Sequence, residues 1–191
     1  MRPEVRMRRT LLFLSILTTV SARAALAQTT PPTLATDIPA AAIQAVLNSQ
    51  PPAGDKLIKS IDIGGYAVGV GILHRGTTRP GAPVGAINHT QLTEIYYVIS
   101  GTATLLTGGT VTNVNAIAAD SDIVKIDVGP SNQGVFERAA QRRKIGPGDV
   151  VIIPAGVYHG FDDVVGGIDY LAFRTDPDHV LPKNYVHPAA K

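Results

Sequence analysis

The segment "GAINHTQLTEIYYVISG" (85–101) decides how this sequence is interpreted, because it places polar side chains at the entrance of an apolar strand. His89 is followed five residues later by Glu94, and the run 95–99 that comes next is apolar. A carboxylate at the start of a buried strand costs several kcal/mol to desolvate unless it is paired or coordinated. The segment therefore predicts a strand that begins with a paired or metal-bound carboxylate.

A second segment, "GPGDVVIIPAGVYHGFDD" (146–163), has the same character. An apolar run is followed by a Pro-Ala-Gly corner at 154–156, and then by a single histidine, His159. Both polar sets lie at the ends of predicted strands, where the mouth of a barrel would be. We therefore expect His89, Glu94 and His159 to meet.

Most of the chain is β in character, and its short strands are separated by Gly, Pro, Asn and Asp. The candidate strands are 57–63, 66–74, 94–100, 102–107, 122–128, 134–137, 149–153 and 168–174. A short helix is predicted over 38–48, with Asp37 as N-cap and Pro39 in the first turn. Both faces of strand 94–100 are largely apolar, which predicts burial between two sheets. Many short strands with glycine-rich turns indicate a sandwich or barrel.

The two segments also contain spaced residues that resemble the two motifs of the cupins, which are β-barrels of jelly-roll type. In the first motif the matching positions are Gly81, Ile87, His89, Glu94 and Gly101; in the second they are Gly148, Pro154, Gly156, His159 and Asp163. The resemblance covers roughly residues 60–175. It implies an all-β, cupin-type jelly-roll barrel, which the short N-terminal helix predicted from the residue pattern precedes.

The resemblance implies a metal site with an altered ligand set. Ile87 stands where most metal-binding cupins have their first histidine, which leaves His89, Glu94 and His159 as ligands. Two imidazoles and a carboxylate can hold Fe(II), Mn(II), Ni(II) or Zn(II) and leave positions open. Gln91 could supply an oxygen in the vacant position. The alternative is a barrel that has lost its metal.

Other polar residues leave two interpretations open. Tyr96 shares a strand face with Glu94, so it could act in the pocket as a catalytic acid or hydrogen-bond donor, or it could be a core tyrosine. The remaining histidines fit solvated positions: His74, His179 and His187. Arginines near the predicted mouth could bind an anionic substrate or remain solvated: Arg75, Arg79 and Arg174.

The chain divides into an N-terminal targeting segment, a lead-in, a barrel and a tail. Residues 1–27 read as a signal peptide, with an arginine-rich start, the apolar run "LLFLSILTTV" and a small-x-small site that ends at Ala27. This predicts a periplasmic or secreted protein without a stable membrane anchor. Residues 28–56 form a flexible lead-in with the short helix, 57–176 the barrel with an inter-motif insertion at 108–143, and 177–191 the tail.

Composition excludes several classes of function. The chain has no cysteine, which rules out thiolate metal sites and cysteine nucleophiles. Its 17 basic and 15 acidic residues give no basic patch outside the predicted signal peptide, so nucleic-acid binding is not expected. We expect a metal-dependent enzyme of the dioxygenase, isomerase or lyase type acting on a small organic molecule. The alternatives are a ligand-binding or sensing module and a metal-free structural barrel, and a homodimer is expected in each case.

Overall fold

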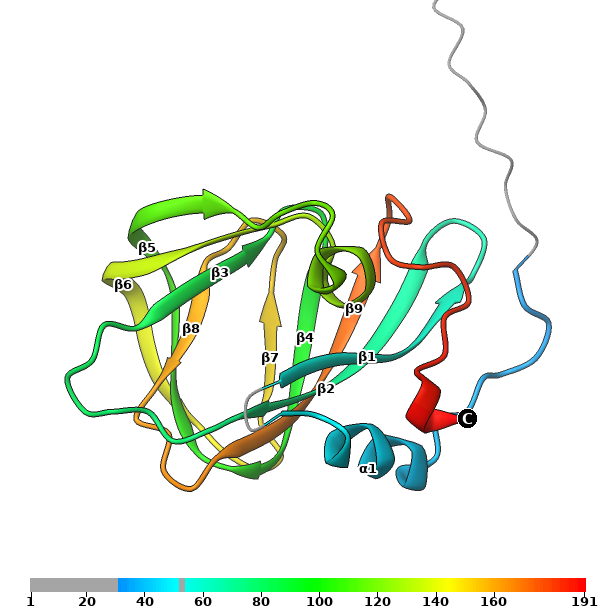
Figure 1. The fold of residues 1–191 in the computed structure, drawn as a ribbon, viewed down its shortest axis with the longest axis horizontal. Coiled ribbons are helices and arrows are strands. Elements are labelled where there is room, and N and C mark those ends of the chain that lie inside the picture. Colours follow the sequence, from blue (N-terminus) through cyan, green and yellow to red (C-terminus); the bar gives the residue numbers. More distant parts are fainter. Residues whose placement is uncertain (1–30, 52–53) are drawn as a thin grey trace, which may run out of the picture.

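The structure, a computed structural model, describes residues 31–51 and 54–191. Two antiparallel β-sheets face each other and form a barrel (Figure 1). The first sheet has the strand order β1-β2-β9-β4-β7. Its strands are β1 (Gly54–Asp62), β2 (Ala67–Arg75), β4 (Thr93–Gly101), β7 (Val150–Ile153) and β9 (Ile168–Asp176).

The second sheet has the order β3-β6-β5-β8 and closes on itself. Its strands are β3 (Gly85–His89), β5 (Ala103–Ala116), β6 (Ser131–Ile145) and β8 (His159–Asp162). The closing pair joins β3 to β8 at Ile87 and His159. This arrangement confirms the predicted all-β jelly-roll barrel. The sequence analysis missed β3 and β8, because five and four residues are too few to show a clear alternation.

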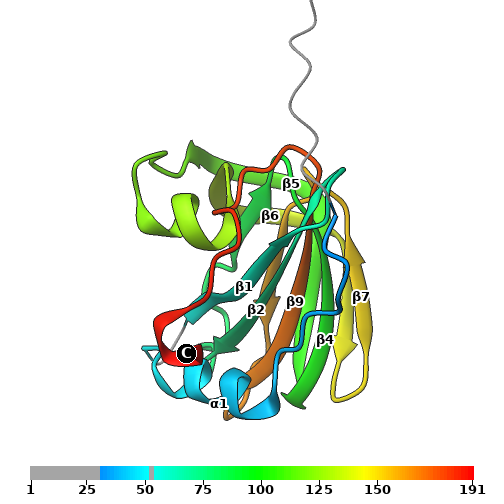
Figure 2. The ribbon, with the colours of Figure 1, turned by 90° about the vertical axis from the view of Figure 1, so that its right-hand side faces the viewer.

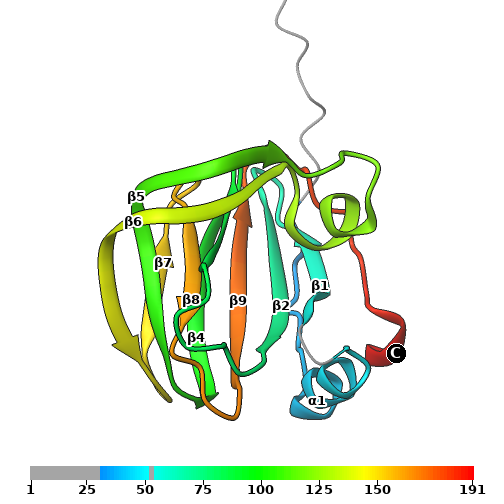
Figure 3. The same ribbon diagram turned by 60° about the vertical axis from the view of Figure 1, so that its left-hand side comes forward.

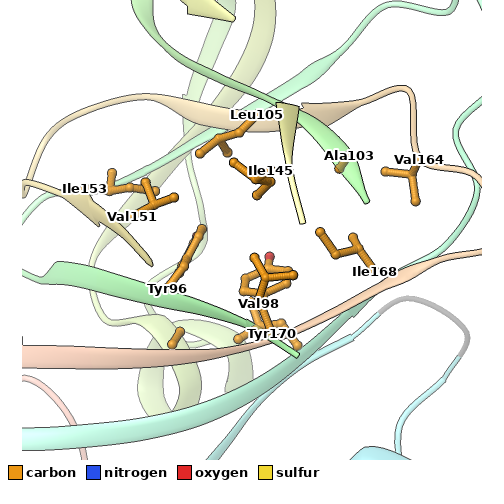
Figure 4. Close-up of a cluster of buried hydrophobic side chains, with 12 residues drawn as sticks. Tyr96, Val98, Ala103, Leu105, Ile145, Val151, Ile153, Val164, Ile168 and Tyr170 are labelled. Carbon is orange, nitrogen blue, oxygen red and sulfur yellow. The ribbon is translucent and has the colours of Figure 1, made fainter. Parts of the chain in front are cut away.

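The main hydrophobic core lies between the two sheets (Figure 4). Inward-facing side chains of both sheets form it: Leu73, Tyr96, Val98, Ala103, Leu105, Ile145, Val151, Ile153, Val164, Ile168, Tyr170 and Ala172. On β4, Tyr96 and Val98 belong to this core, whereas Glu94 precedes them on the same face. The candidate site therefore lies immediately next to the packed core.

Helix α1 (Ala40–Asn48) packs outside the barrel, against β1 and β2 (Figure 2). Its buried residue Val46 contacts Ile58 and Ile72 on the outer face of the first sheet. The prediction of a short N-terminal helix is confirmed, but its start was wrong. Pro39, not Asp37, is the N-cap, and no side chain caps the helix.

Strands β5 and β6 form a long hairpin that curves over the barrel and carries the helix η1 (Ile123–Val128) at its end (Figure 3). The predicted strand 122–128 is therefore wrong. The apolar pattern also suits a helix, because Val124 and Val128 are both buried on one side. The Asp127 carboxylate then joins η1 to β1 by accepting a hydrogen bond from Leu57 N at 2.9 Å and pairing with Lys56 Nζ at 2.9 Å.

The outer face of the first sheet is solvent-exposed along strands β4 and β7. Tyr97 and Ile99 of β4 are 44% and 43% exposed, and Val150 and Ile152 of β7 are 62% and 66% exposed. The expectation that strand 94–100 is buried on both faces was wrong. The sheet covers the core with one face only, and α1 reaches β1 and β2 but not this strip.

The C-terminal residues cover the opposite edge of the first sheet. Ser60 N donates to Tyr185 O at 3.0 Å, and His187 N donates to Ile58 O at 2.8 Å. The short helix η2 (Pro188–Ala190) lies against α1. Within the described part of the chain, no helix combines the length and apolar character needed to cross a membrane.

Candidate metal centre

Three side chains from three strands converge inside the barrel. His89 ends β3, Glu94 is the second residue of β4, and His159 begins β8. Their ligand atoms all lie within 4.8 Å of one another, and all three residues are buried. His89 Nε2 lies 3.3 Å and His159 Nε2 3.4 Å from Glu94 Oε2. The structure thus brings together the three residues that the sequence analysis expected to meet.

The ring of His89 is held by a hydroxyl group behind it. His89 Nδ1 lies 2.8 Å from Ser131 Oγ, and Ser131 Oγ donates to Gly129 O at 2.9 Å. Because the serine proton is used on Gly129, its oxygen accepts from the Nδ1–H of His89. The Nε2 lone pair of His89 is therefore directed toward Glu94, as in histidine ligands that are oriented by a second hydrogen bond.

The ring of His159 is oriented in the same way. Its Nδ1–H donates to Val157 O at 3.1 Å, which leaves the Nε2 lone pair toward the centre of the cluster. Burial lowers the pKa of His159 to about 4, although the neighbouring Glu94 carboxylate opposes this shift. The imidazole is thus neutral at ordinary pH, which is the form that can bind a metal ion.

Glu94 makes charge-assisted hydrogen bonds with both carboxylate oxygens. Arg174 Nε donates to Oε1 at 2.8 Å, and the Tyr96 hydroxyl donates to Oε2 at 2.7 Å. Burial alone would raise the pKa of Glu94, but the Arg174 charge and the interactions with His89 and His159 together outweigh burial and hold this pKa well below the usual range. Burial and the Glu94 charge together raise the pKa of Tyr96 far above its usual value. The pair is therefore a carboxylate and a neutral phenol.

Arg174 links the cluster to a second carboxylate. It lies opposite Glu94 on the neighbouring strand β9, and its Nη2 also donates to Asp55 at 2.7 and 2.8 Å. The side chain is fully buried and passes over Gly71 of β2, where an added Cβ would lie 2.8 Å from Arg174 Nη1. The sequence analysis considered Arg174 as an anion-binding or a solvated residue and missed this role. The alternating glycines Gly69 and Gly71 were the available signal.

The donor set fits a metal ion. Two imidazole lone pairs and one carboxylate oxygen face one another, and no hydrogen lies on either Nε2–Oε2 contact in this tautomer. Such an arrangement is stabilised by a cation at its centre. The surroundings also oppose the binding of a cation, because the Arg174 charge already offsets the Glu94 charge. The cluster can therefore hold a divalent ion as a three-ligand site with open positions.

A cavity of about 660 Å³ lies beside the cluster. His159 lines it, together with Ile87, which occupies the position that the family motif gives to a further histidine. Tyr96 does not line the cavity, since it is buried in the core and bonded to Glu94. Gln91 lies in the turn between β3 and β4, and within the described residues no hydrogen bond connects it to the cluster.

The other histidines lie elsewhere. His74 Nδ1 lies 2.7 Å from Asp169 Oδ1, away from the cluster. His179 is exposed and lies 3.5 Å from Asp62, and His187 accepts a hydrogen bond from Ala189 N in the C-terminal segment. None of these three belongs to the group of converging ligand atoms. The sequence interpretation of them as residues outside the site agrees with these positions.

The chain forms two antiparallel sheets that face each other, and both motif segments supply neighbouring side chains to the interior. These two features identify the fold. It is a cupin fold. No protein-family model matches the sequence, and no curated protein matches it at a significant level. The cupin fold of the chain is thus recognised from its structure and its two spaced motifs.

Solved structures match the chain only distantly. A Bacillus halodurans protein shares 13% identity over 82% of this chain and 89% of its own, with a TM-score of 0.44. KdgF from a Halomonas species shares 13% identity over 66% of this chain and 81% of its own, with a TM-score of 0.41. The cupin domain of Schizosaccharomyces pombe Cnp3 shares 10% identity over 68% of this chain and 66% of its own, with a TM-score of 0.41. Likenesses this low transfer neither an activity nor a ligand.

Proposed function

We propose that the chain is a metal-dependent cupin enzyme that acts on a small organic molecule bound in the 660 Å³ cavity. The observation that carries this proposal is the convergence of His89, Glu94 and His159 within 4.8 Å beside that cavity. The cavity volume falls in the range of roughly 300–1,000 Å³ that is usual for small-molecule sites. Reactions of the dioxygenase, isomerase or lyase type are all compatible with this arrangement.

His89, Glu94 and His159 would hold the ion, which would be Fe, Mn, Ni or Zn. When bound, such an ion supplies Lewis-acid polarisation of the substrate or, for a redox-active metal, one-electron chemistry. The protein's own residues orient the site. Ser131 and the Val157 carbonyl fix the two imidazole rings, and the neutral Tyr96 hydroxyl holds the Glu94 carboxylate.

Elemental analysis of the purified protein tests this proposal. We expect near-stoichiometric divalent metal in the wild type, a severe loss in His159→Ala, and an unchanged content in His74→Ala. His74 is the matched control because it is a histidine on a neighbouring sheet that is bonded to Asp169 instead of to the cluster. Equal metal content in all three proteins, or a wild type that cannot be loaded, would contradict the proposal.

A second candidate function, or second reading of the site, is the binding of a small ligand without turnover, with or without a metal. The neutralisation of Glu94 by Arg174 favours this reading, because it lets the buried carboxylate persist without a cation. The two readings differ in the fate of the bound molecule. A metal-loaded protein that binds a compound and returns it unchanged over many hours supports the binding module.

We also propose export, on the sequence pattern of residues 1–27, which lie outside the described residues. The exported protein is then periplasmic or secreted, and it begins at Gln28 after cleavage behind Ala27. The mass of the intact protein recovered from the exported fraction measures this directly. A mass that includes the arginine-rich start would contradict cleavage.

Finally, we propose that two copies of the chain associate through the bare outer strip of β4 and β7. The strip consists of Ile95, Tyr97, Ile99, Val150 and Ile152, and it carries no charged side chain. A second copy presents the same uncharged surface, so a two-fold contact brings no like charges together. Burying the side chains of Tyr97, Ile99, Val150 and Ile152, which are 43–66% exposed, is favourable.

A further inference from the structure

Arg75 occupies a special position in the wall of the cavity. It is the last residue of β2, and it lines the same 660 Å³ space as His159 of the candidate metal centre. The charged residues of the lining are Arg75 and Asp55, and the rest is apolar or uncharged, including Ile87 and Phe161. The cavity therefore offers one guanidinium group and one carboxylate to a bound molecule.

The two charged residues differ in how they are already bonded. The Asp55 carboxylate is occupied by Arg174, at 2.7 and 2.8 Å. The guanidinium of Arg75 makes a single hydrogen bond in the described part of the chain, in which Nε donates to the Tyr170 hydroxyl at 3.2 Å. No ion pair of Arg75 occurs within those residues. Its terminal nitrogens therefore remain available as donors.

The balance of charges around the cavity also favours the binding of an anion. Arg75 and Arg174 are balanced by Asp55 and Glu94. A divalent ion on the cluster would therefore add two uncompensated positive charges in a poorly solvated site. Buried charge of this kind requires a counter-charge. A neutral ligand cannot supply it, whereas a carboxylate can.

We infer that the cavity binds a small organic carboxylate, and that the terminal nitrogens of Arg75 hold its carboxylate group. A planar guanidinium with two free terminal nitrogens matches the geometry of a carboxylate, and its charge is permanent. The apolar body of the ligand then lies against Ile87 and Phe161, next to His159. This inference deepens the proposed function by naming the substrate class of the same site, and it rests on that function for the metal beside it.

Calorimetric titration with matched probes tests the inference. Acetate, pyruvate and benzoate are titrated into the full chain, and acetamide and benzamide serve as uncharged counterparts. Each titration is run on chelator-treated and on zinc-loaded protein, with the zinc content measured separately. We expect at least one carboxylate to bind at least tenfold more tightly than the amides, a difference that corresponds to one charge-assisted hydrogen-bonded pair.

Variants assign this preference to Arg75. Arg75→Gln should remove the preference for carboxylates over amides, while Arg79→Gln should keep it. Arg79 is the matched control because it is an arginine four residues away that is exposed and does not line the cavity. Binding of none of the three carboxylates, or an equal preference in wild type and Arg75→Gln, would overturn the inference.

The same data separate the inference from the proposed function. A wild type that binds zinc but prefers no carboxylate overturns the inference and leaves the metal site standing. A chain that takes up no metal yet binds a carboxylate through Arg75 supports the inference and contradicts the metal-dependent enzyme.

A measurement on the wild type alone covers the case in which Arg75→Gln fails to fold. Phenylglyoxal modifies accessible arginines, and the modified positions are located by peptide mass analysis. The best-binding carboxylate should protect Arg75 from modification and leave Arg79 as reactive as before. Equal reactivity of Arg75 with and without the carboxylate would overturn the inference.

Discussion

Arg174 lies directly opposite Glu94 across strands β9 and β4, and its Nε donates to Glu94 Oε1 at 2.8 Å. The candidate metal ligand is therefore also one half of a buried ion pair. Both side chains are at most 1% exposed, and Arg174 is shared with Asp55. Stability and metal binding consequently depend on the same carboxylate.

Removing the guanidinium should destabilise the barrel strongly. In Arg174→Met, the Glu94 and Asp55 carboxylates lose their buried partner, and breaking such a pair costs about 3–5 kcal/mol. Denaturant unfolding measures the loss. Arg142→Met is the control, because its pair with Asp162 also spans 2.7 Å but its side chain is 49% exposed. We expect that control to lose less than about 1 kcal/mol, and equal losses in the two variants would contradict the role given to Arg174.

Gly71→Ala should destabilise the protein by displacing Arg174. The new Cβ would lie 2.8 Å from Arg174 Nη1 and 3.1 Å from Lys56 O, so the guanidinium must shift away from its partners. Crowding of this kind costs roughly 1–3 kcal/mol, which thermal unfolding can measure. Gly65→Ala is the matched control, since no atom lies within 4 Å of its added Cβ. Identical melting temperatures for the two variants would refute the crowding argument.

The metal-free protein should lose stability in mild acid because of His159. Burial lowers the pKa of His159 from 6.5 to about 4 in the folded state, so between these values the unfolded chain binds more protons. The contribution is complete above pH 6.5 and is lost as the pH falls toward 4. It amounts to something on the order of 3 kcal/mol.

Denaturant unfolding in the presence of a chelator, repeated from pH 7 to pH 4, measures this loss. His159→Gln cannot be protonated in this range, so its stability should fall less steeply with pH than that of the wild type. Parallel pH profiles for the two proteins would show that His159 is not the titrating group.

The bare strip of β4 and β7 should support self-association. Ile152 is 66% exposed on the edge strand β7, so Ile152→Lys places a charge in the proposed contact without disturbing the core. Light scattering should show a dimer for the wild type and a monomer for the variant, with similar melting of each folded chain. A wild type that remains monomeric at all concentrations would rule out the dimer.

The sequence alone was sufficient for much of the fold and for the members of the cluster. The alternation of side chains along 94–100 correctly grouped Glu94 with Tyr96, and the spacing of the two motifs brought His89 and His159 to the same site. The first of these features depends on local periodicity, which a sequence expresses directly, whereas the second was implied by the resemblance to the cupin motifs. The helix η1 shows the limit, because its apolar pattern suits a strand as well as a helix.

Only the tertiary structure decided what surrounds the cluster. Arg174 is 80 residues from Glu94, and the register between β4 and β9 that pairs them is set by packing across the whole sheet. The tertiary structure also decided how two arginines differ in their bonding. Arg174 pairs with the two carboxylates of Glu94 and Asp55, whereas Arg75 lines the cavity and makes its one hydrogen bond, among the described residues, through Nε. Partners this distant in the chain leave no local pattern, because their proximity arises only when the two sheets close into a barrel.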